Sequence, residues 1–507
     1  MLTQVQSKPA SPARFAFAGV LAHRLAARLR TTPGRLEAAL VTLVVAAALF
    51  WAVVASVFSS LYDAVRTVGR DTVPSIVAAE KMNVALADIN TNFANAVLAK
   101  DDDSKPSWRT IKEDSDAVSH ALITAAENVT YGAEEENPIY AIESNLPVYF
   151  RVLGQARSKL QTDPLPDLRA ASELMQTTIM SAGFALDEAN FRHLTASYDR
   201  HRANRARAWA ELLLAIGALG GLLIVVQLDL ARRTRRLVNP PLFGATALLA
   251  VFAIYLVIVF SGAGEQLRAA KQDSFDSIHA LWKARAIAYD ANAEESLYLL
   301  ERGPLQARHE KAFFDKSAQL LSGPPPAEAI TKATARRFND IKGYIGDELN
   351  NITYPGEEAA ALDLLRTFVD YIDIDRKIRD LERAGRHAEA FALCVGTAPG
   401  QSDWAFERFD KALVKVLDIN EQFFASQVES AFAYLAWIPW AVPFAALAIA
   451  VLTRLSQLKQ KSLEYQGGTP KSLHYRAPSF MSRSSRWSSI FEISFSRANS
   501  HRNFRRQ

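Results

Sequence analysis

The sequence contains a single cysteine, Cys394, among 507 residues. One cysteine excludes an intramolecular disulfide framework and any zinc cluster built from cysteine thiolates. The sequence also lacks a P-loop pattern and an HExxH pattern, and its nine histidines are scattered along the chain. We therefore expect no enzyme activity, no cofactor and no metal site.

The sequence also lacks a large excess of charge of one sign. Its 58 Lys and Arg residues are nearly balanced by 54 Asp and Glu residues, which leaves a net charge of +4. So small an excess gives no argument for nucleic-acid binding, which requires a strongly basic surface. Hydrophobic residues make up 49% of the chain and are segregated into uncharged runs. This segregation excludes both a simple globular enzyme and a fully disordered chain.

Four long runs contain almost no charge, and each has about the 20 residues that a helix needs to cross a bilayer. They cover residues 38–58, 209–229, 242–264 and 430–453. Because backbone groups in lipid must bond internally, we interpret all four as membrane-spanning helices. The alternative, four buried helices of a soluble protein, is disfavoured by the number and length of the runs. The long basic lead-in favours a retained anchor over a cleaved signal peptide for the first run.

Basic residues in the short segments set the expected orientation, because they favour the cytoplasmic side. They occur before the first run, between the second and third runs, and after the fourth. We therefore place the protein in the cell membrane with both termini in the cytoplasm. A basic stretch before the second run, residues 200–207, argues for the reverse orientation, but long translocated segments obey the rule poorly. The deciding residues are Lys8, Arg14, Arg24, Arg28, Arg30, Arg35, Arg232, Arg233, Arg235, Arg236, Arg454, Lys459 and Lys461.

The runs divide the chain into two halves with the same plan, in which two spans flank one outer block. We expect both blocks outside the cell, and too little cytoplasmic chain for a kinase or cyclase domain. The predicted segments are a basic N-terminal segment (1–37), span one (38–58), outer block one (59–208), span two (209–229), a basic turn (230–241), span three (242–264), outer block two (265–429), span four (430–453) and a basic-aromatic tail (454–507).

A weak internal repeat supports duplication of the halves. Ala85–Lys100 can be laid over Ile287–Arg302 without gaps, which places Asp88 opposite Asp290 and Asn90 opposite Asn292. Such a short match is common by chance, so the shared order of segments is the stronger argument.

Both outer blocks are rich in good helix formers and lack the alternating β-branched runs of strands. The fold class is therefore all-α, with each block an elongated four-helix bundle. Helix breaks are expected near residues 101–106, 131–138 and 162–166 in the first block, and near 303–304, 323–326, 354–356 and 385–400 in the second.

Two short patterns, Asn128-Val129-Thr130 and Asn351-Ile352-Thr353, match the acceptor for N-glycosylation. Three-residue patterns recur by chance. The alanine-rich composition is typical of bacteria, so we discount glycosylation.

The C-terminal tail from Gln466 carries eight basic residues and one acid, Glu492, with aromatic residues between them. Such a segment can lie on anionic lipid. It can equally dock a partner or form an unstructured extension, and the sequence leaves these three interpretations open.

Several short stretches occur in an order that is shared with a known family. They are Thr32–Leu36, Arg232–Arg236 with Asn239-Pro240, Leu146–Tyr149 with Ala156-Arg157, Ala171–Met175, and Glu295–Leu297 with Arg302-Gly303. Together they resemble an actinobacterial family of four-span membrane signalling proteins of the GlnX type. This resemblance implies a relay from an external solute-binding lipoprotein, which senses acidic amino acids, to a soluble serine/threonine kinase.

The leading hypothesis is a non-enzymatic signal transducer that relays an extracytoplasmic cue to a cytoplasmic partner such as a kinase. The alternatives are a component of a transporter or channel and an envelope scaffold. Expected partners are membrane lipids, an external solute-binding protein and the kinase; an oligomer is compatible with the sequence, and nucleic acid is not expected. The candidate contact residues are Asn90, Tyr149, Arg157, Asp290, Glu294 and Glu295.

Overall fold

A computed structural model describes residues 32–100, 106–234 and 239–467. The chain divides into two units, residues 1–457 and 458–507, and the described helices lie in the first unit except for the end of the last helix, residues 458–467. Within the described residues every element is a helix, and β structure is limited to one isolated bridge between Ser322 and Lys342. The N-terminal basic residues before 32 and the tail beyond 467 lie outside the described ranges.

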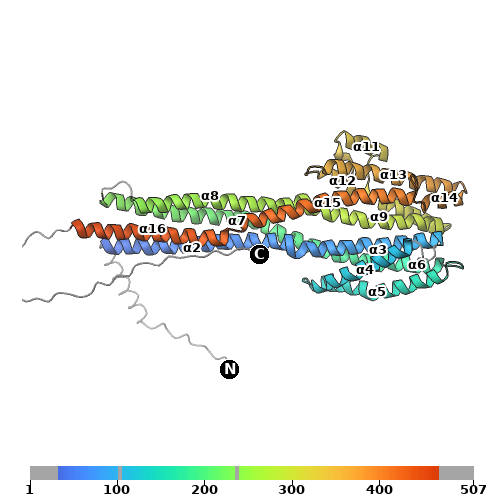
Figure 1. Ribbon diagram of the computed structural model, residues 1–507, viewed down its shortest axis with the longest axis horizontal. Helices are drawn as coiled ribbons and strands as arrows, with labels where there is room; N and C mark the ends of the chain where they lie inside the picture. Colours follow the sequence, from blue (N-terminus) through green and yellow to red (C-terminus); the bar gives the residue numbers. More distant parts are fainter. Residues whose placement is uncertain (1–31, 101–105, 235–238, 468–507) are drawn as a thin grey trace, which may run out of the picture. The chain divides into compact units, whose positions relative to one another are not determined.

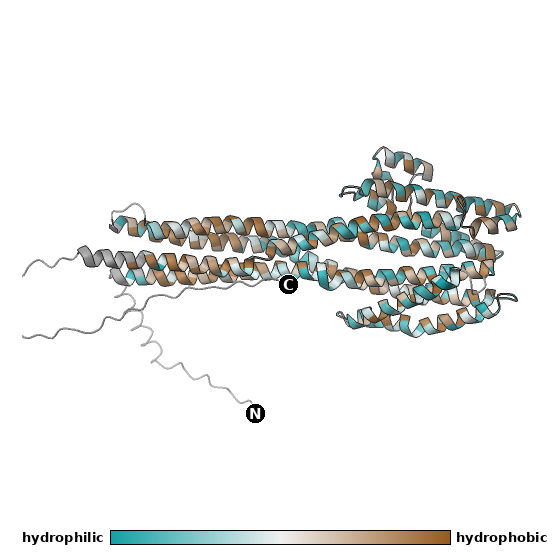
Figure 2. Ribbon diagram, viewed as in Figure 1, coloured by the Kyte–Doolittle hydropathy of each residue, from teal (hydrophilic) through white to brown (hydrophobic). Residues whose placement is uncertain are grey.

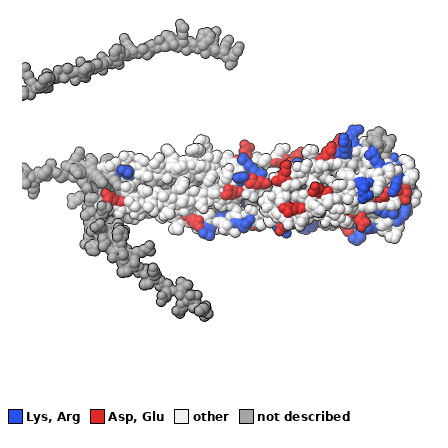
Figure 3. All heavy atoms as spheres, turned by 90° about the horizontal axis from the view of Figure 1, so that it is seen from below, with Lys and Arg blue, Asp and Glu red and all other residues white. Residues whose placement is uncertain are grey.

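Among the described residues, four helices are long and apolar enough to cross a membrane, in agreement with the four runs. The predicted spans lie in α2 (Thr32–Arg66), α7 (Ser181–Thr234), α8 (Pro240–Arg268) and the pair α15 (Ser402–Leu435) and α16 (Ile438–Gly467). Large apolar side chains on these helices are exposed, which is the arrangement expected of a surface that faces lipid. Figure 2 shows this apolar end of the unit, and charged side chains gather over the opposite end on the face in Figure 3.

The fourth span is not one continuous helix. α15 ends at Leu435 and α16 begins at Ile438, directly before Pro439. Proline has no N–H to donate and is tolerated in the first turn of a helix, so a break at this point satisfies the backbone. Pro443 lies inside α16.

The first outer block contains the four expected helical segments. They are α3 (Val73–Ala99), α4 (Pro106–Glu127), α5 (Ala133–Ser158), and α6 (Leu165–Leu174) continued by the π-helix η2 (Met175–Met180) into α7. Each helix end falls at or within a few residues of a predicted break.

The second outer block has more helices than the predicted four-helix bundle. Its long helices are α9 (Asp276–Leu300), α10 (Pro304–Leu320), α13 (Glu357–Arg383) and α15. Short helices stand between them: α11 (Pro326–Thr334), the 3-10 helix η4 (Phe338–Asp340), α12 (Tyr344–Asn350) and α14 (His387–Cys394).

One chain reversal in this block, residues 335–343, was not predicted. Two residues in it have positive φ, Arg336 at 55° and Gly343 at 84°. The stretch contains no proline and several good helix formers, so it resembles a continuous helix in sequence.

The two halves repeat each other over more residues than the sequence match covers. Laying Ala85 on Ile287 is a shift of 202 residues, and the same shift carries the start of the π-helix η1 (Thr67–Thr72) onto that of η3 (Ala269–Phe275). Each π-helix joins a span to the first helix of an outer block. The ion pair between Arg66 and Asp71 recurs at the same shift as the pair between Arg268 and Asp273.

The two outer blocks are joined through their first helices. α3 packs along α9, with α4 to α6 beyond α3 and α10 to α14 beyond α9 (Figure 1). The larger hydrophobic core contains residues of both halves, such as Ile76 and Phe275, and both are fully buried. The blocks therefore form one packed body, which the sequence did not predict.

Candidate functional site

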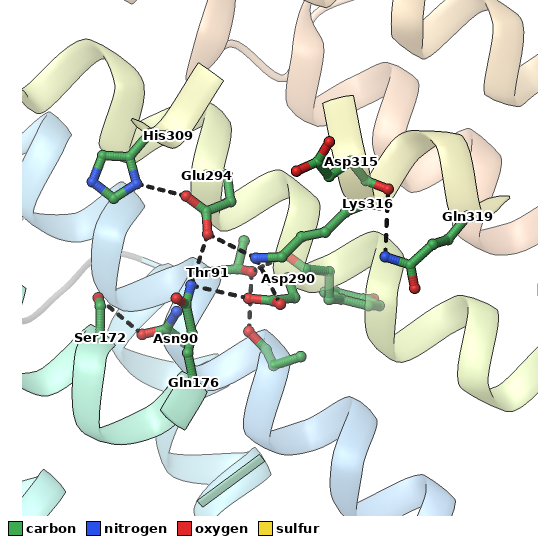
Figure 4. Close-up of polar contacts among 12 residues, drawn as sticks. Asn90, Thr91, Ser172, Gln176, Asp290, Glu294, His309, Asp315, Lys316 and Gln319 are labelled. Atoms are coloured by element: carbon green, nitrogen blue, oxygen red, sulfur yellow. Dashed lines mark hydrogen bonds and ion pairs between the residues drawn. The ribbon is translucent and has the colours of Figure 1, made fainter. Parts of the chain in front are cut away.

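Three of the candidate residues lie close together in the seam between the halves. Asn90 of α3 and Asp290 and Glu294 of α9 approach Gln176 of η2 and Lys316 of α10 (Figure 4). We call this group the seam cluster; its other members are Thr91, Ser172 and His309.

The carboxylates of the seam cluster are fully paired. Lys316 Nζ lies 2.7 Å from Asp290 Oδ2 and 2.7 Å from Glu294 Oε1. Gln176 Nε2 donates to Glu294 Oε1 at 2.9 Å and to Asp290 Oδ1 at 3.3 Å. His309 Nδ1 lies 2.6 Å from Glu294 Oε2, so each of the four carboxylate oxygens has a partner. The arrangement is that of an internal ion-pair network.

The charges in this network shift one another's protonation. Burial raises the pKa of Asp290, although Lys316 opposes the shift. Burial acts in the same direction on Glu294, but the hydrogen bond with His309 and the charge of Lys316 outweigh it and lower its pKa to about 2. The protonation states of Asp290 and Glu294 therefore depend on the charge of Lys316.

Hydrogen bonds also cross the seam directly. Thr91 Oγ1 donates to the backbone oxygen of Tyr289 at 2.7 Å. Ser296 Oγ donates to Asn95 Oδ1. Asn90 accepts a bond from Ser172 at 3.2 Å, and its side-chain nitrogen has no partner. Hydrogen bonds at Thr91 and Asn95 thus join α3 to α9 at two points along the helices, and they hold the two helices in one register.

Glu295 adjoins Glu294 in sequence but lies in a different environment. Burial, and then the charge of Asp375, raise the pKa of Glu295 to about 8. Arg379 forms a bidentate pair with Asp375 at 2.9 and 2.8 Å, and all three side chains are almost completely buried. Cys394 is buried beside this group.

The last two candidate residues are separate from the seam cluster. Tyr149 is fully buried in the first block, where its ring meets that of Phe93 edge to face, and burial raises its pKa. Arg157 lies on the surface with its guanidinium 4.6 Å from the ring centroid of Trp108. The structure thus brings together three of the six predicted residues and places the others in three different surroundings.

A polar pocket that the sequence did not predict lies where η1 joins α2 to α3. Its volume is about 410 Å³. We call it the junction pocket, and its lining comes from η1, α3, the α4–α5 loop, α5 and α7. The lining residues are Thr67, Arg70, Asp71, Thr72, Ser75, Asn128, Thr130, Tyr131, Glu135 and Asn190.

The loop that forms one wall of the junction pocket is held by Glu135. Its carboxylate accepts hydrogen bonds from the backbone N–H groups of Thr130 and Tyr131, both at 2.6 Å. The Tyr131 ring stacks on His193 of α7 with 3.9 Å between centroids. Gly132 makes the turn into α5 with a φ of 62°, which favours glycine.

The second half contains the same loop, built from the other sequon-like pattern. Glu357 accepts from the backbone N–H groups of Thr353 and Tyr354 at 2.6 and 2.8 Å. The Tyr354 ring stacks on Phe423 of α15 with 4.0 Å between centroids. The two Asn-x-Thr-Tyr stretches are therefore copies of one structural motif that caps the next helix.

The space beside this second loop is closed by hydrogen bonds. Tyr354 Oη lies 2.6 Å from Ser274 Oγ, and Asn351 Nδ2 donates to Ser277 Oγ at 2.7 Å. Asn420 of α15 donates to Glu357 at 3.0 Å. Several polar groups of the second half are therefore bonded to one another, although Oδ1 of Asn420 keeps no partner among the described residues.

The corresponding groups of the first half face the junction pocket. Thr72 and Ser75 take the places of Ser274 and Ser277 at the shift of 202 residues. Asn190 precedes the stacked ring of His193 by three residues, as Asn420 precedes that of Phe423.

Asn190 is 5% exposed and lines the junction pocket. Its side-chain amide is therefore placed to meet a ligand in the pocket. The two carboxylates of the lining are already engaged, Asp71 with Arg66 and Glu135 with the loop backbone. The donors and acceptors suit a small polar organic molecule better than a metal ion.

Sequence comparison bears on this half of the chain. Residues 64–199 match the model of a protein family described as the actinobacterial sensor domain. The match falls within the first half of the chain. All residues that line the junction pocket, from Thr67 to Asn190, lie inside the matched region. No curated protein and no solved structure matches the chain.

The match to a sensor-domain family supports a signal-sensing role for a chain in which four described helices are fit for a membrane. The sequence offers one signal for the pocket, the recurrence of Asn-x-Thr-Tyr in both halves, although each copy alone is indistinguishable from a chance sequon.

Proposed function

We propose that this protein is a transmembrane signal transducer that binds a small polar solute in the junction pocket and relays its presence to a cytoplasmic partner. The observation that carries the proposal is the position of the pocket. It lies wholly inside the region that matches the sensor-domain family, and one wall is η1, which is continuous with the first span.

The lining favours a solute that carries charges of both signs, and we propose an amino acid. Arg70 offers a guanidinium group for a carboxylate, and Asn190 offers both a donor and an acceptor. Asp71 is paired with Arg66 at 3.2 Å, but its side chain is half exposed, so it can share its carboxylate with the ammonium group of a solute. The resemblance to GlnX-type proteins supports the same class of cue, with an external solute-binding protein as its source.

The relay would run through helices that touch the pocket and enter the membrane. Arg70 lies 4.2 Å from the ring centroid of Phe432 on α15, so the pocket wall contacts the helix that leads to the fourth span. A π-helix has an extra residue in its turn and is often found at functional sites. A solute that binds one arrangement of η1 more tightly shifts the population toward that arrangement. A serine/threonine kinase is the partner that the resemblance favours.

The pocket is tested by binding measurements on the purified full chain. Titration calorimetry with a panel of amino acids, dicarboxylates and polyamines is expected to find an amino acid that binds. Asn190→Leu should lower its affinity at least about tenfold, which corresponds to about 1.4 kcal/mol, because a buried polar partner is lost.

The matched control is Asn204→Leu, on the same helix α7, because Asn204 is exposed and outside the junction pocket. Its affinity should equal that of the wild type. Equal affinities of all three proteins, or no binding by any solute of the panel, would contradict the proposal.

The proposed orientation has its own test. Ser144→Cys on the exposed face of α5 is expected to react with a membrane-impermeant maleimide in intact cells, whereas Arg232→Cys beside the basic turn should react only after lysis. The wild type, whose Cys394 is buried, gives the background labelling. The opposite pattern would place the outer blocks in the cytoplasm.

A further inference from the structure

Three side chains of metal-ligating type meet between α3, α7 and α9. They are Glu80, Asp187 and His279, which are 2%, 1% and 8% exposed. One potential ligand atom of each lies within 4.8 Å of the others. The first two residues belong to the first half and the third belongs to the second half.

Their spacing matches that of ligands around one metal ion. His279 Nε2 lies 3.0 Å from Asp187 Oδ2 and 3.6 Å from Glu80 Oε1. Nitrogen and oxygen ligands lie about 2.0–2.2 Å from a zinc ion, which separates neighbouring ligands by about 3.0–3.6 Å at right or tetrahedral angles.

The side chains do not satisfy one another without an ion. Both carboxylate oxygens of Glu80 and Oδ1 of Asp187 are buried and have no hydrogen-bond partner among the described residues. The Nε2 atom of His279 carries at most one proton, so it cannot serve all the oxygens that face it. Buried carboxylate oxygens without a partner are costly, which makes this group unlike the fully paired seam cluster.

We infer that Glu80, Asp187 and His279 form a binding site for a divalent transition-metal ion. One imidazole and two carboxylates suit Zn²⁺, Mn²⁺ or Fe²⁺, and the absence of thiolate ligands disfavours soft ions. Two positive charges would balance the two carboxylates, and water would complete the coordination.

The surroundings of the site hold its ligands in place. The ring of Phe191 stacks on His279 with 3.9 Å between centroids and an angle of 6° between planes. Burial, and then the neighbouring Asp187, raise the pKa of Glu80, to which Glu421 adds and which Lys283 opposes. An ion would remove this crowding of like charges.

A metal ion here would join the halves near the π-helices η1 and η3. It would connect α7, which leads to the second span, to α3 and α9, which follow the first and third. Sequence spacing predicted no metal site, because the three ligands come from three helices and are far apart in the chain. The inference is independent of the solute proposed for the junction pocket.

Metal binding is tested on the purified full chain after treatment with a chelator. Zn²⁺ is expected to bind at one ion per chain and to raise the unfolding temperature by several degrees, because it binds the folded state. Co²⁺ should give a visible absorption band typical of a protein ligand set. Glu80→Gln and His279→Gln should each abolish the Co²⁺ band and the Zn²⁺-dependent shift.

The control variant is Glu188→Gln, next to Asp187 but with its side chain 59% exposed, and it should retain the band and the shift. Size-exclusion chromatography and circular dichroism establish that each variant is folded. If His279→Gln does not fold, Glu80→Gln decides, since it removes a charge from a crowded site. A wild type that binds neither ion, or a band that persists in the folded variants, overturns the inference.

Discussion

Replacing Lys316 with methionine is expected to destabilise the protein by about 3–5 kcal/mol, the usual cost of breaking a buried ion pair by removing one partner. Lys316 is the ammonium group shared by Asp290 and Glu294. Methionine preserves most of the volume, so the loss would come from leaving the buried carboxylate of Glu294 and the largely buried carboxylate of Asp290 without their cation. The measurement is the free energy of unfolding in detergent, from denaturant titration followed by tryptophan fluorescence.

A matched control lies on the same helix. Lys311 pairs with Asp315 on the surface, where its side chain is 77% exposed, so Lys311→Met should cost only about 0–1 kcal/mol. Adding Glu294→Gln to Lys316→Met should recover part of the stability, because one uncompensated charge is removed. Equal effects of the two lysine substitutions would show that the seam cluster contributes nothing beyond surface pairing.

Stability is expected to fall as the pH rises from about 5 to 8, with Glu348 as one cause. Burial, and then the carboxylate of Glu357, raise the pKa of Glu348 from 4.5 to about 8. The unfolded chain releases this proton near pH 4.5, whereas the folded protein retains it to about pH 8. The contribution of Glu348 is therefore fully present below pH 4.5 and is lost as the pH rises through 8.

Glu348→Gln should remove this dependence, because glutamine is neutral at every pH. The stability of the variant relative to the wild type should increase by at most about 1.4 kcal/mol per pH unit across this window. Unfolding midpoints at pH 6, 7 and 8 give the comparison, with exposed Glu143→Gln as the control. A difference that does not change with pH would contradict the assignment. Glu295, whose pKa is also raised to about 8, should leave a residual slope in the variant.

Much of the helical layout could be predicted, because its signals are local. Proline and glycine mark the helix ends around Gly303–Pro304 and Gly385. The reversal at 335–343 shows where this approach fails. There the turn depends on positive φ at Arg336 and on backbone contacts that only the folded chain provides.

The candidate site could be predicted only in part. Asp290 and Glu294 stand four residues apart, so a helix places them on one face, as the seam cluster requires. The partners Gln176 and Lys316 come from distant segments and were not predicted. Glu295 follows Glu294 directly, yet the helix turns it toward Asp375 and into a different charge environment.

The sequence by itself determined four helices that are apolar and long enough to cross a membrane, and two helical blocks in a duplicated order. Hydrophobic runs and helix-ending residues set these features locally, within one or a few helical turns. Only the tertiary structure decided that α3 packs along α9 and that Glu80, Asp187 and His279 meet. It also decided that the junction pocket stays open while the matching groups of the second half bond to one another. These outcomes depend on which side chains complement each other across contacting helices. Such pairing is non-local, and residues about one to two hundred positions apart carry no periodic signal of it.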